Sequence, residues 1–148
     1  MSGTPKDARM KKILVSACLY GNKCRYKGDD CYNEKLAELG KNNVLIPVCP
    51  EQLGGLSTPR HPAERVGDKI ISDIGADVTE EYLRGAKLAL AIAKTNNVDL
   101  CVMKAKSPSC GKGVIYDGTF SGGKKQGNGV TTELFLAEGF TVITEDEL

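Results

Sequence analysis

Four short apolar runs, separated by helical patterns and long loops, are the feature that most constrains the fold of this chain. The runs cover residues 13–17, 44–48, 100–105 and 140–143. They are continuous rather than alternating, which is typical of parallel strands that are buried on both faces. Because helical segments separate them, the pattern predicts an α/β fold with one doubly wound, mainly parallel sheet of about four strands. Helices should cover both faces, and long loops should lie at the carboxyl edge.

The segments between the runs carry the helical signals. Helices are expected over residues 34–39, 80–95 and 130–138. Their expected N-terminal caps are Asn33 for the first, Asp77 or Thr79 for the second, and Asn128 or Gly129 for the third. In the longest helix, one face should collect the apolar side chains at helical spacing, namely Leu83, Ala86, Leu90 and Ala93.

Proline and glycine mark the irregular parts of the chain. Pro47 lacks a backbone donor, so the second strand should lie at an edge or contain a bulge. Residues 49–65 are rich in proline and should hold no regular structure, whereas residues 66–74 are expected to form a hairpin or a short extended segment. Residues 111–129 hold seven of the 17 glycines and are predicted to form a long loop.

Size and charge limit the class of protein. The 148 residues suit one domain, and a net charge of +1 gives no general attraction to nucleic acid or to an anionic membrane. No apolar run approaches the roughly 18 residues of a membrane span. Residues 1–10 are expected to be a disordered or vector-derived extension before a single domain over 11–148, and they do not read as a secretory signal. We therefore expect a cytoplasmic protein whose cysteines are reduced.

Three cysteines follow three of the predicted strands. Cys18 and Cys49 come directly after the first and second strands, and Cys110 lies a few residues beyond the third. The carboxyl ends of parallel strands meet at one edge of a sheet, where open α/β sheets bind ligands. Each cysteine also has glycine or proline nearby, so the backbone can turn around a bound group. The sequence therefore predicts one shared thiol site.

The other three cysteines have weaker claims to this site. Cys101 lies inside the third strand and should be a core residue. Cys24 and Cys31 lie in the polar loop after the first strand, and the chain contains no C-x-x-C motif. Cys24 is close enough to Cys18 to be a spare thiol of the site, and the spacing leaves that role open.

Three thiolates without a histidine favour iron–sulfur or zinc. A structural zinc site normally takes four ligands from paired short motifs, whereas these cysteines come from three separate strand ends. That arrangement suits a bulkier cluster. A cubane cluster needs four iron ligands, so three cysteines would leave one iron open to bind substrate as a Lewis acid.

Several motifs together resemble the thiouracil desulfidase-like family, a bacterial family formerly catalogued as a domain of unknown function. They are ILVSACLYG, PVCPEQLGGLSTPR, KSPSCG, IYDGTFSG and GNGVTTELF, and the resemblance runs over residues 12–145. It implies a 4Fe-4S cluster held by Cys18, Cys49 and Cys110. The fourth iron would bind the sulfur of a thiolated uracil, and the products would be uracil and sulfide with no net redox change.

The resemblance also implies two catalytic residues. The acid–base residue falls on Glu51, and the serine that faces the substrate falls on Ser107. The chain departs from the usual pattern at Tyr20 and Lys27, which bears on substrate preference rather than on the cluster. The expected partner is a small thiolated base or nucleoside, and the oligomeric state is left open.

Two other functions fit the residues alone. One is a small-molecule binding module that holds zinc or no metal, and the other is a thiol redox or persulfide-carrying protein that uses Cys18 and Cys24. Arg60 and His61 could bind the carbonyl edge of a substrate, although their proline-rich surroundings favour exposure at the surface.

Overall fold

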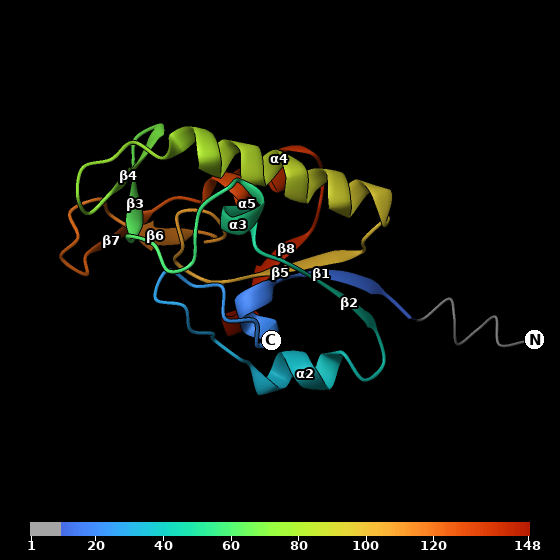
Figure 1. Cartoon of the computed structure of the whole chain (residues 1–148). Coiled ribbons are helices and arrows are strands. Elements are labelled where there is room, and N and C mark those ends of the chain that lie inside the picture. The colour runs from blue at the N-terminus through green and yellow to red at the C-terminus, as the bar shows by residue number, and fades with distance from the viewer. Residues whose placement is uncertain (1–9) are drawn as a thin grey trace, which may run out of the picture.

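A four-stranded parallel sheet forms the centre of the computed structural model, which describes residues 10–148 (Figure 1). Its strand order is β2-β1-β5-β8, and each neighbouring pair is parallel. The strands are β1 (Lys12–Ser16), β2 (Val44–Val48), β5 (Leu100–Met103) and β8 (Val142–Thr144). The expected α/β fold is confirmed. The extension predicted over residues 1–10 lies, apart from Met10, outside the described residues.

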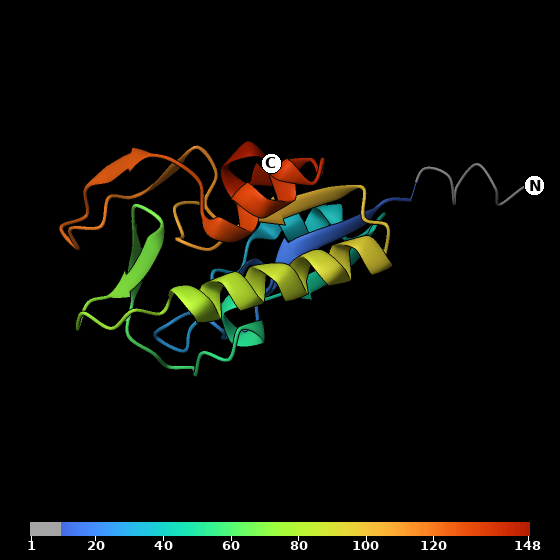
Figure 2. The same cartoon turned by 90° about the horizontal axis from the view of Figure 1, so that it is seen from above.

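Helices cover both faces of this sheet (Figure 1, Figure 2). The connection from β1 to β2 runs through α2 (Glu34–Leu39) on one face. The later connections run through α4 (Thr79–Thr95) and α5 (Val130–Ala137), which pack against each other on the opposite face. The strand order therefore reverses between β1 and β5, which makes the carboxyl edge there the natural binding crevice.

The side chains of β1 alternate between two hydrophobic clusters. Leu14 packs with Ala89 and Ala93 on the α4 face, whereas Ile13 and Val15 belong to the cluster on the α2 side. All three β1 side chains are almost fully buried. A strand that is buried on both faces explains why its sequence reads as a continuous apolar run.

The outer position of β2 agrees with the expectation for Pro47. The residue pairs with Val15 of β1, and no strand of residues 10–148 lies on the other side of β2. The first helix also begins as predicted, because the side chain of Asn33 accepts a hydrogen bond from the backbone N–H of Leu36 at 3.0 Å.

The start of α4 differs from the expectation. Its N-cap is Val78, whose side chain makes no capping bond. The Thr79 hydroxyl instead accepts a hydrogen bond from the Ile70 N–H at 2.9 Å, and the Asp77 carboxylate accepts one from the Thr79 N–H. The Thr79 side chain thus fastens the start of the helix to the preceding hairpin, whereas Asp77 bonds to Thr79. The third helix begins after Gly129, which is one of its two predicted caps.

Two segments predicted to be irregular contain regular structure. Residues 49–65 include the short helix α3 (Pro50–Leu53) and the first residues of β3 (Ala63–Val66), which pairs with β4 (Lys69–Ser72). Residues 111–129 include a hairpin of β6 (Val114–Tyr116) and β7 (Lys124–Gln126). Proline at the first position of α3 helps that helix to start, because its missing N–H needs no partner there. Both hairpins lie beyond the carboxyl ends of the sheet (Figure 1).

Smaller differences have packing causes. Leu83 is expected on the apolar face of α4, but it is 44% exposed, and its neighbour Tyr82 is buried instead. The last strand starts two residues later than predicted, because the Phe140 N–H still closes α5 on the carbonyl of Phe135. Within residues 10–148, no helix is long and apolar enough to cross a membrane.

Candidate active site

A cavity of about 340 Å³ opens at the carboxyl edge of the sheet. Four cysteines line it, and so do Glu51 and Ser107. The cysteines are Cys18, Cys24, Cys49 and Cys110. The structure thus brings together the three cysteines and the two other residues that sequence and resemblance predict for the site. It also adds Cys24, whose place the spacing left open.

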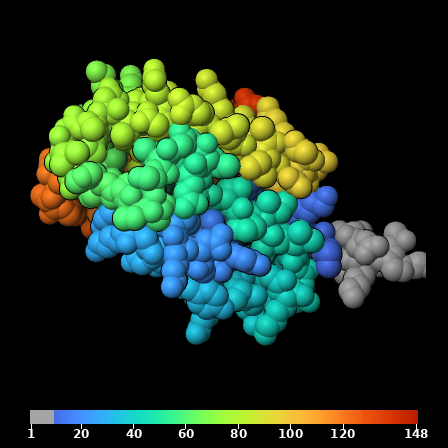
Figure 3. All heavy atoms as spheres, in the orientation of Figure 1, coloured from blue at the N-terminus to red at the C-terminus, as the bar shows by residue number. Residues whose placement is uncertain are grey.

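The loop after β1 and the segment after β2 close one side of this cavity. In the space-filling view they lie directly against each other (Figure 3). The Arg60 N–H donates to the carbonyl of Tyr26 at 2.8 Å, and the Arg60 guanidinium donates to the carbonyl of Cys24 at 2.8 Å. Arg60 thus joins the two segments that carry Cys24 and Cys49.

Cys18 is held by the short helix η1 (Ala17–Tyr20), which continues from the end of β1. Its side chain is buried, and its carbonyl accepts hydrogen bonds from the N–H groups of Gly21 and Cys31. Gly21 adopts a φ of +108°, which a side chain would disfavour, so the chain can turn sharply here. The turn keeps Cys18 at the sheet edge.

Cys49 is the N-cap residue of α3 and is half-buried. Its thiol lies 3.9 Å from the carbonyl oxygen of Cys24. A hydrogen bond with the Cys24 thiol and burial both raise the pKa of Cys49 above its ordinary value. The pKa of the neighbouring Cys24 is raised to about 11, mainly by a hydrogen bond with Cys18. Cys24 therefore interacts with both Cys18 and Cys49.

Cys110 lies in a loop that Ser107 and α5 hold in place. The Ser107 hydroxyl accepts hydrogen bonds from the N–H groups of Ser109 and Cys110, each at 2.9 Å. Thr132 at the start of α5 donates from its hydroxyl to the Cys110 carbonyl at 2.7 Å. Burial raises the pKa of the Cys110 thiol to about 12. Because Ser107 uses its oxygen as an acceptor, its hydroxyl hydrogen can still point into the cavity.

Glu51 is a carboxylate in the wall of the cavity, and two side chains orient it. Its Oε2 accepts hydrogen bonds from Arg60 at 3.1 and 3.2 Å and from the Tyr82 hydroxyl at 2.9 Å. Every hydrogen bond that the Glu51 side chain accepts within residues 10–148 ends on Oε2. The second oxygen, Oε1, is thus the one available to a substrate or a water.

The predicted exposure of Arg60 is wrong, and the sequence did not indicate Tyr82 as a residue of the site. The Arg60 side chain is only 7% exposed although exposure was expected, because its charge is paired with Glu51. His61 does lie at the surface, beside Asp73. Tyr82 is buried in α4, and burial raises the pKa of its hydroxyl above the ordinary value. The hydroxyl therefore stays protonated and remains a donor to Glu51.

The remaining predictions for the cysteines agree with the structure. Cys101 is fully buried in the core, where burial raises its pKa to about 12. Cys31 is half-buried beside the α2-side cluster and does not line the cavity. Lys104, a wall residue that was not predicted, lies 2.8 Å from the carboxylate of Glu145 in a partly buried ion pair.

The donors fit a thiophilic group wider than one ion. In the described part of the chain, no three His, Cys, Asp or Glu side chains converge closely enough to hold a single metal ion. The thiols line the walls of a cavity instead, and soft thiolates are the usual ligands of iron–sulfur clusters. Cys18, Cys49 and Cys110 approach from three strand ends, with a carboxylate beside them.

Together, the fold and the site define an α/β protein with a thiol-lined cavity for a small ligand at the carboxyl edge of a parallel sheet. The chain belongs to the 2-thiouracil desulfurase family, whose model matches residues 13–147. This confirms the resemblance seen in the motifs.

Two individual proteins are similar over nearly the whole chain. A solved structure described as the [4Fe-4S]-dependent thiouracil desulfidase TudS is 44% identical, with a TM-score of 0.88 and 93% of each chain covered. A protein of Bacillus subtilis (strain 168) called Uncharacterized protein YbbK is 47% identical over 146 residues, which is 92% of this chain and 97% of that protein.

Proposed function

We propose that this protein removes sulfur from a thiolated pyrimidine of the 4-thiouracil type by hydrolysis, and that it depends on a 4Fe-4S cluster held by Cys18, Cys49 and Cys110. The observation that carries the proposal is the cavity in which these three thiols meet an oriented carboxylate. The similarity to a [4Fe-4S]-dependent thiouracil desulfidase supports both the cofactor and the substrate class.

The bound cluster would supply a soft Lewis acid, because three protein thiolates leave one of its irons without a protein ligand. The overall reaction exchanges sulfur for oxygen: water adds its oxygen to the ring carbon, and sulfide leaves with the protons. No electron is gained or lost. The residues of this chain must therefore position water, move protons and hold the ring.

Glu51 is the residue we propose for proton transfer. Glu51 lines the cavity, and Arg60 and Tyr82 hold its Oε2, which leaves Oε1 for a substrate or a water and restricts rotation of the carboxylate. A general base must lie within hydrogen-bond reach of the proton that it takes, and a fixed carboxylate meets this requirement best. Oε1 would take a proton from water and return it to the departing sulfur.

Ser107 has two tasks in this proposal. Its oxygen organises the loop of Cys110, and its hydroxyl hydrogen can bond to a polar atom of the substrate or to the attacking water. Loss of Ser107 would therefore disturb both the position of a ligand and the orientation of the reactants.

We further propose that the protein acts in the cytoplasm on a small thiolated base or nucleoside. All six cysteines are free thiols in the structure, and such thiols persist in a reducing compartment.

The test is anaerobic reconstitution with iron and sulfide, followed by measurement of sulfide release from 4-thiouracil. The wild-type protein should bind about four irons and release sulfide, and Cys110→Ser should lose both. Cys31→Ser is the matched control, because Cys31 does not line the cavity. A fully loaded protein that releases no sulfide would contradict the proposal.

The position of Cys24 next to Cys18 keeps one alternative open, a thiol redox or persulfide function. Cys24→Ser separates the two. The cluster-dependent reaction should keep most of its rate in this variant, whereas a reaction that runs through the Cys18–Cys24 pair should be abolished.

A further inference from the structure

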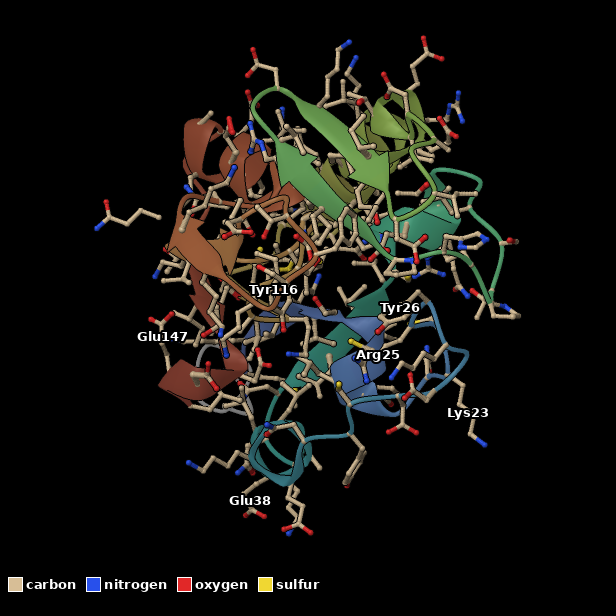
Figure 4. All side chains as sticks on the ribbon, turned by 90° about the vertical axis from the view of Figure 1, so that its left-hand side faces the viewer. Lys23, Arg25, Tyr26, Glu38, Tyr116 and Glu147 are labelled. Carbon is tan, nitrogen blue, oxygen red and sulfur yellow. The ribbon has the colours of Figure 1, made fainter. Side chains whose placement is uncertain are left out.

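Besides Tyr82, which donates to Glu51, three further aromatic side chains line the cavity. They are Tyr26 in the loop after β1, Tyr116 at the end of β6, and Phe120 in the loop between β6 and β7. Tyr26 and Tyr116 come from different segments and lie on the same side of the molecule (Figure 4). No step of the proposed reaction uses these rings, so their presence at the cavity needs a separate reason.

Phe120 is the ring that the fold explains least. Its backbone has a φ of +57°, a left-handed conformation that is unfavourable for residues with a large side chain. The side chain is also 39% exposed, so burial in the core does not compensate for this conformation. Residues held in such conformations cluster at ligand clamps and active sites.

Glu64 of β3 holds the loop in this conformation. Its Oε1 accepts hydrogen bonds from the N–H groups of Gly118 at 2.9 Å and Phe120 at 3.1 Å. Gly118 also lies so close to β3 that a Cβ atom there would be only 3.1 Å from the carbonyl oxygen of Arg65. The carboxylate and the close approach together fix the loop against β3, with Phe120 at the cavity wall.

The other two rings already have partners. The guanidinium of Arg25 lies 5.9 Å from the centre of the Tyr26 ring, and the ammonium of Lys124 lies 5.9 Å from that of Tyr116. Among residues 10–148, the ring of Phe120 has no aromatic or cationic partner of this kind. A phenyl ring offers no hydrogen bond, so the ligand that it suits is a flat π-system.

We propose that Phe120 is a specificity-determining residue that stacks on the planar ring of the substrate, and that Glu64 is the positioning residue that holds it there. This inference rests on the proposed function, because a thiolated pyrimidine is such a planar ring. Stacking recognises the flat face and not the edge of the ring, so it leaves the thiocarbonyl free to approach the thiol side of the cavity.

The test compares two ligands that share their hydrogen-bonding edge. Uracil is planar, whereas 5,6-dihydrouracil is puckered and has lost its aromatic character. Binding of both to the anaerobically reconstituted protein can be measured by competition against 4-thiouracil desulfuration and by calorimetry. The wild-type protein should prefer uracil by about tenfold, the order expected for one stacked ring.

Three variants at position 120 make the test specific. Phe120→Leu should bring the ratio of the affinities for uracil and 5,6-dihydrouracil close to one. In the desulfuration of 4-thiouracil it should raise KM and leave kcat little changed. Phe120→Tyr keeps the ring and should keep the preference. Phe120→Gly should also lose the preference, yet it should not lower the melting temperature, because glycine accepts a positive φ without strain.

Glu64 is tested by rescue. Glu64→Gln retains an oxygen that can accept both N–H groups and should keep the preference for uracil, whereas Glu64→Ala should lose it. An unchanged ratio of the two affinities in Phe120→Leu, with uracil still bound by the wild-type protein, would overturn this inference alone. A wild-type protein that binds neither uracil nor 4-thiouracil would overturn the proposed function and this inference with it.

Discussion

Glu51 shows how residues that are distant in sequence orient one proposed catalytic group. Arg60 is nine residues away, and Tyr82 comes from the following helix, yet both donate to the same carboxylate oxygen. The Arg60–Glu51 pair is largely buried, with exposed fractions of 7% and 18% for the two side chains. Such a pair persists because each partner satisfies the other, and removal of one leaves a buried charge.

Tyr82→Phe tests this arrangement with the smallest possible change. The ring still fills the core, but one of the donors to Oε2 is lost. Hydrogen bonds to charged groups contribute about 1.5–3 kcal/mol, so kcat/KM for 4-thiouracil should fall by roughly 10- to 100-fold. Tyr32→Phe, at an exposed position outside the cavity, should retain the wild-type value. Equal rates for Tyr82→Phe and the wild type would mean that Tyr82 does not orient Glu51.

The sequence located the thiols of the site better than it located their supports. The cysteines could be predicted because each follows a strand and the topology places strand ends together. Tyr82 could not, because the helical face drawn through Leu83 was off by one residue, and only the packing of α4 decides which of the two is buried. Arg60 looked exposed because its partner Glu51 is recognisable only after α3 has formed.

At the scale of elements, the close contact of α3 and α4 positions the segment that carries Cys49 and Glu51. Gly54 at the end of α3 and Gly85 inside α4 face each other across this contact. A Cβ atom on Gly85 would overlap the carbonyl oxygen of Pro50, and one on Gly54 would overlap that of Glu81. Backbone therefore packs directly on backbone here.

Gly85→Ala should accordingly destabilise the protein. In an exposed helix interior this substitution would stabilise by up to about 1 kcal/mol, but here the added methyl group must push α3 away. We expect a loss of about 1–3 kcal/mol in the free energy of unfolding, together with lower cluster occupancy, because Cys49 moves with α3. Denaturant unfolding and iron content measure the two effects.

Leu88→Ala serves as the control for that prediction. Leu88 lies on the exposed side of the same helix, so its truncation should change the free energy of unfolding by less than about 0.5 kcal/mol. If Gly85→Ala were as stable as Leu88→Ala and kept its iron, the helices could separate freely and the contact would not position the site.

The elements themselves were predictable to different degrees. The central strands and the three longer helices follow from periodicity and caps, with small shifts at their ends. The hairpins beyond the sheet were only partly predicted, because β6 and β7 are three residues each and flanked by glycine. Their pairing depends on contacts such as Glu64 with Gly118, which join segments more than fifty residues apart.

At the scale of the whole molecule, buried thiols should make the protein sensitive to alkali. Cys101 is fully buried, and burial raises its pKa from 9.0 to about 12. A raised pKa means that the folded state holds the proton more tightly than the unfolded state does. Its contribution to stability is therefore complete below about pH 9 and is lost as the pH rises from 9 towards 12.

Cys101→Ala should reduce this dependence in the cluster-free, reduced protein. One titrating group can change the free energy of unfolding by at most about 1.4 kcal/mol per pH unit. The contribution of Cys101 to this slope should be absent from the variant when urea unfolding is measured between pH 8 and pH 11. Val102→Ala removes buried atoms from the same strand but no titratable group, so it should lower stability equally at every pH. If the free energy of unfolding of Cys101→Ala fell with pH as steeply as that of the wild type, Cys101 would not be a source of the sensitivity to alkali.

The site also links the folding of the whole domain to its cofactor. Cys18, Cys49 and Cys110 lie after β1, β2 and β5, so a group bound to all three would join the two strands next to the switch point with the edge strand.

A ligand that binds only the folded state stabilises it, by about 4 kcal/mol when its free concentration is a thousand times its dissociation constant. For a chain of this size, that corresponds to a rise of roughly 8–16 °C in melting temperature. Reconstituted wild-type protein should show such a rise over the chelator-treated protein, and Cys31→Ser should show the same rise. Cys49→Ser should lose most of it, and equal melting temperatures for loaded and stripped wild-type protein would contradict a cluster held by the three strand ends.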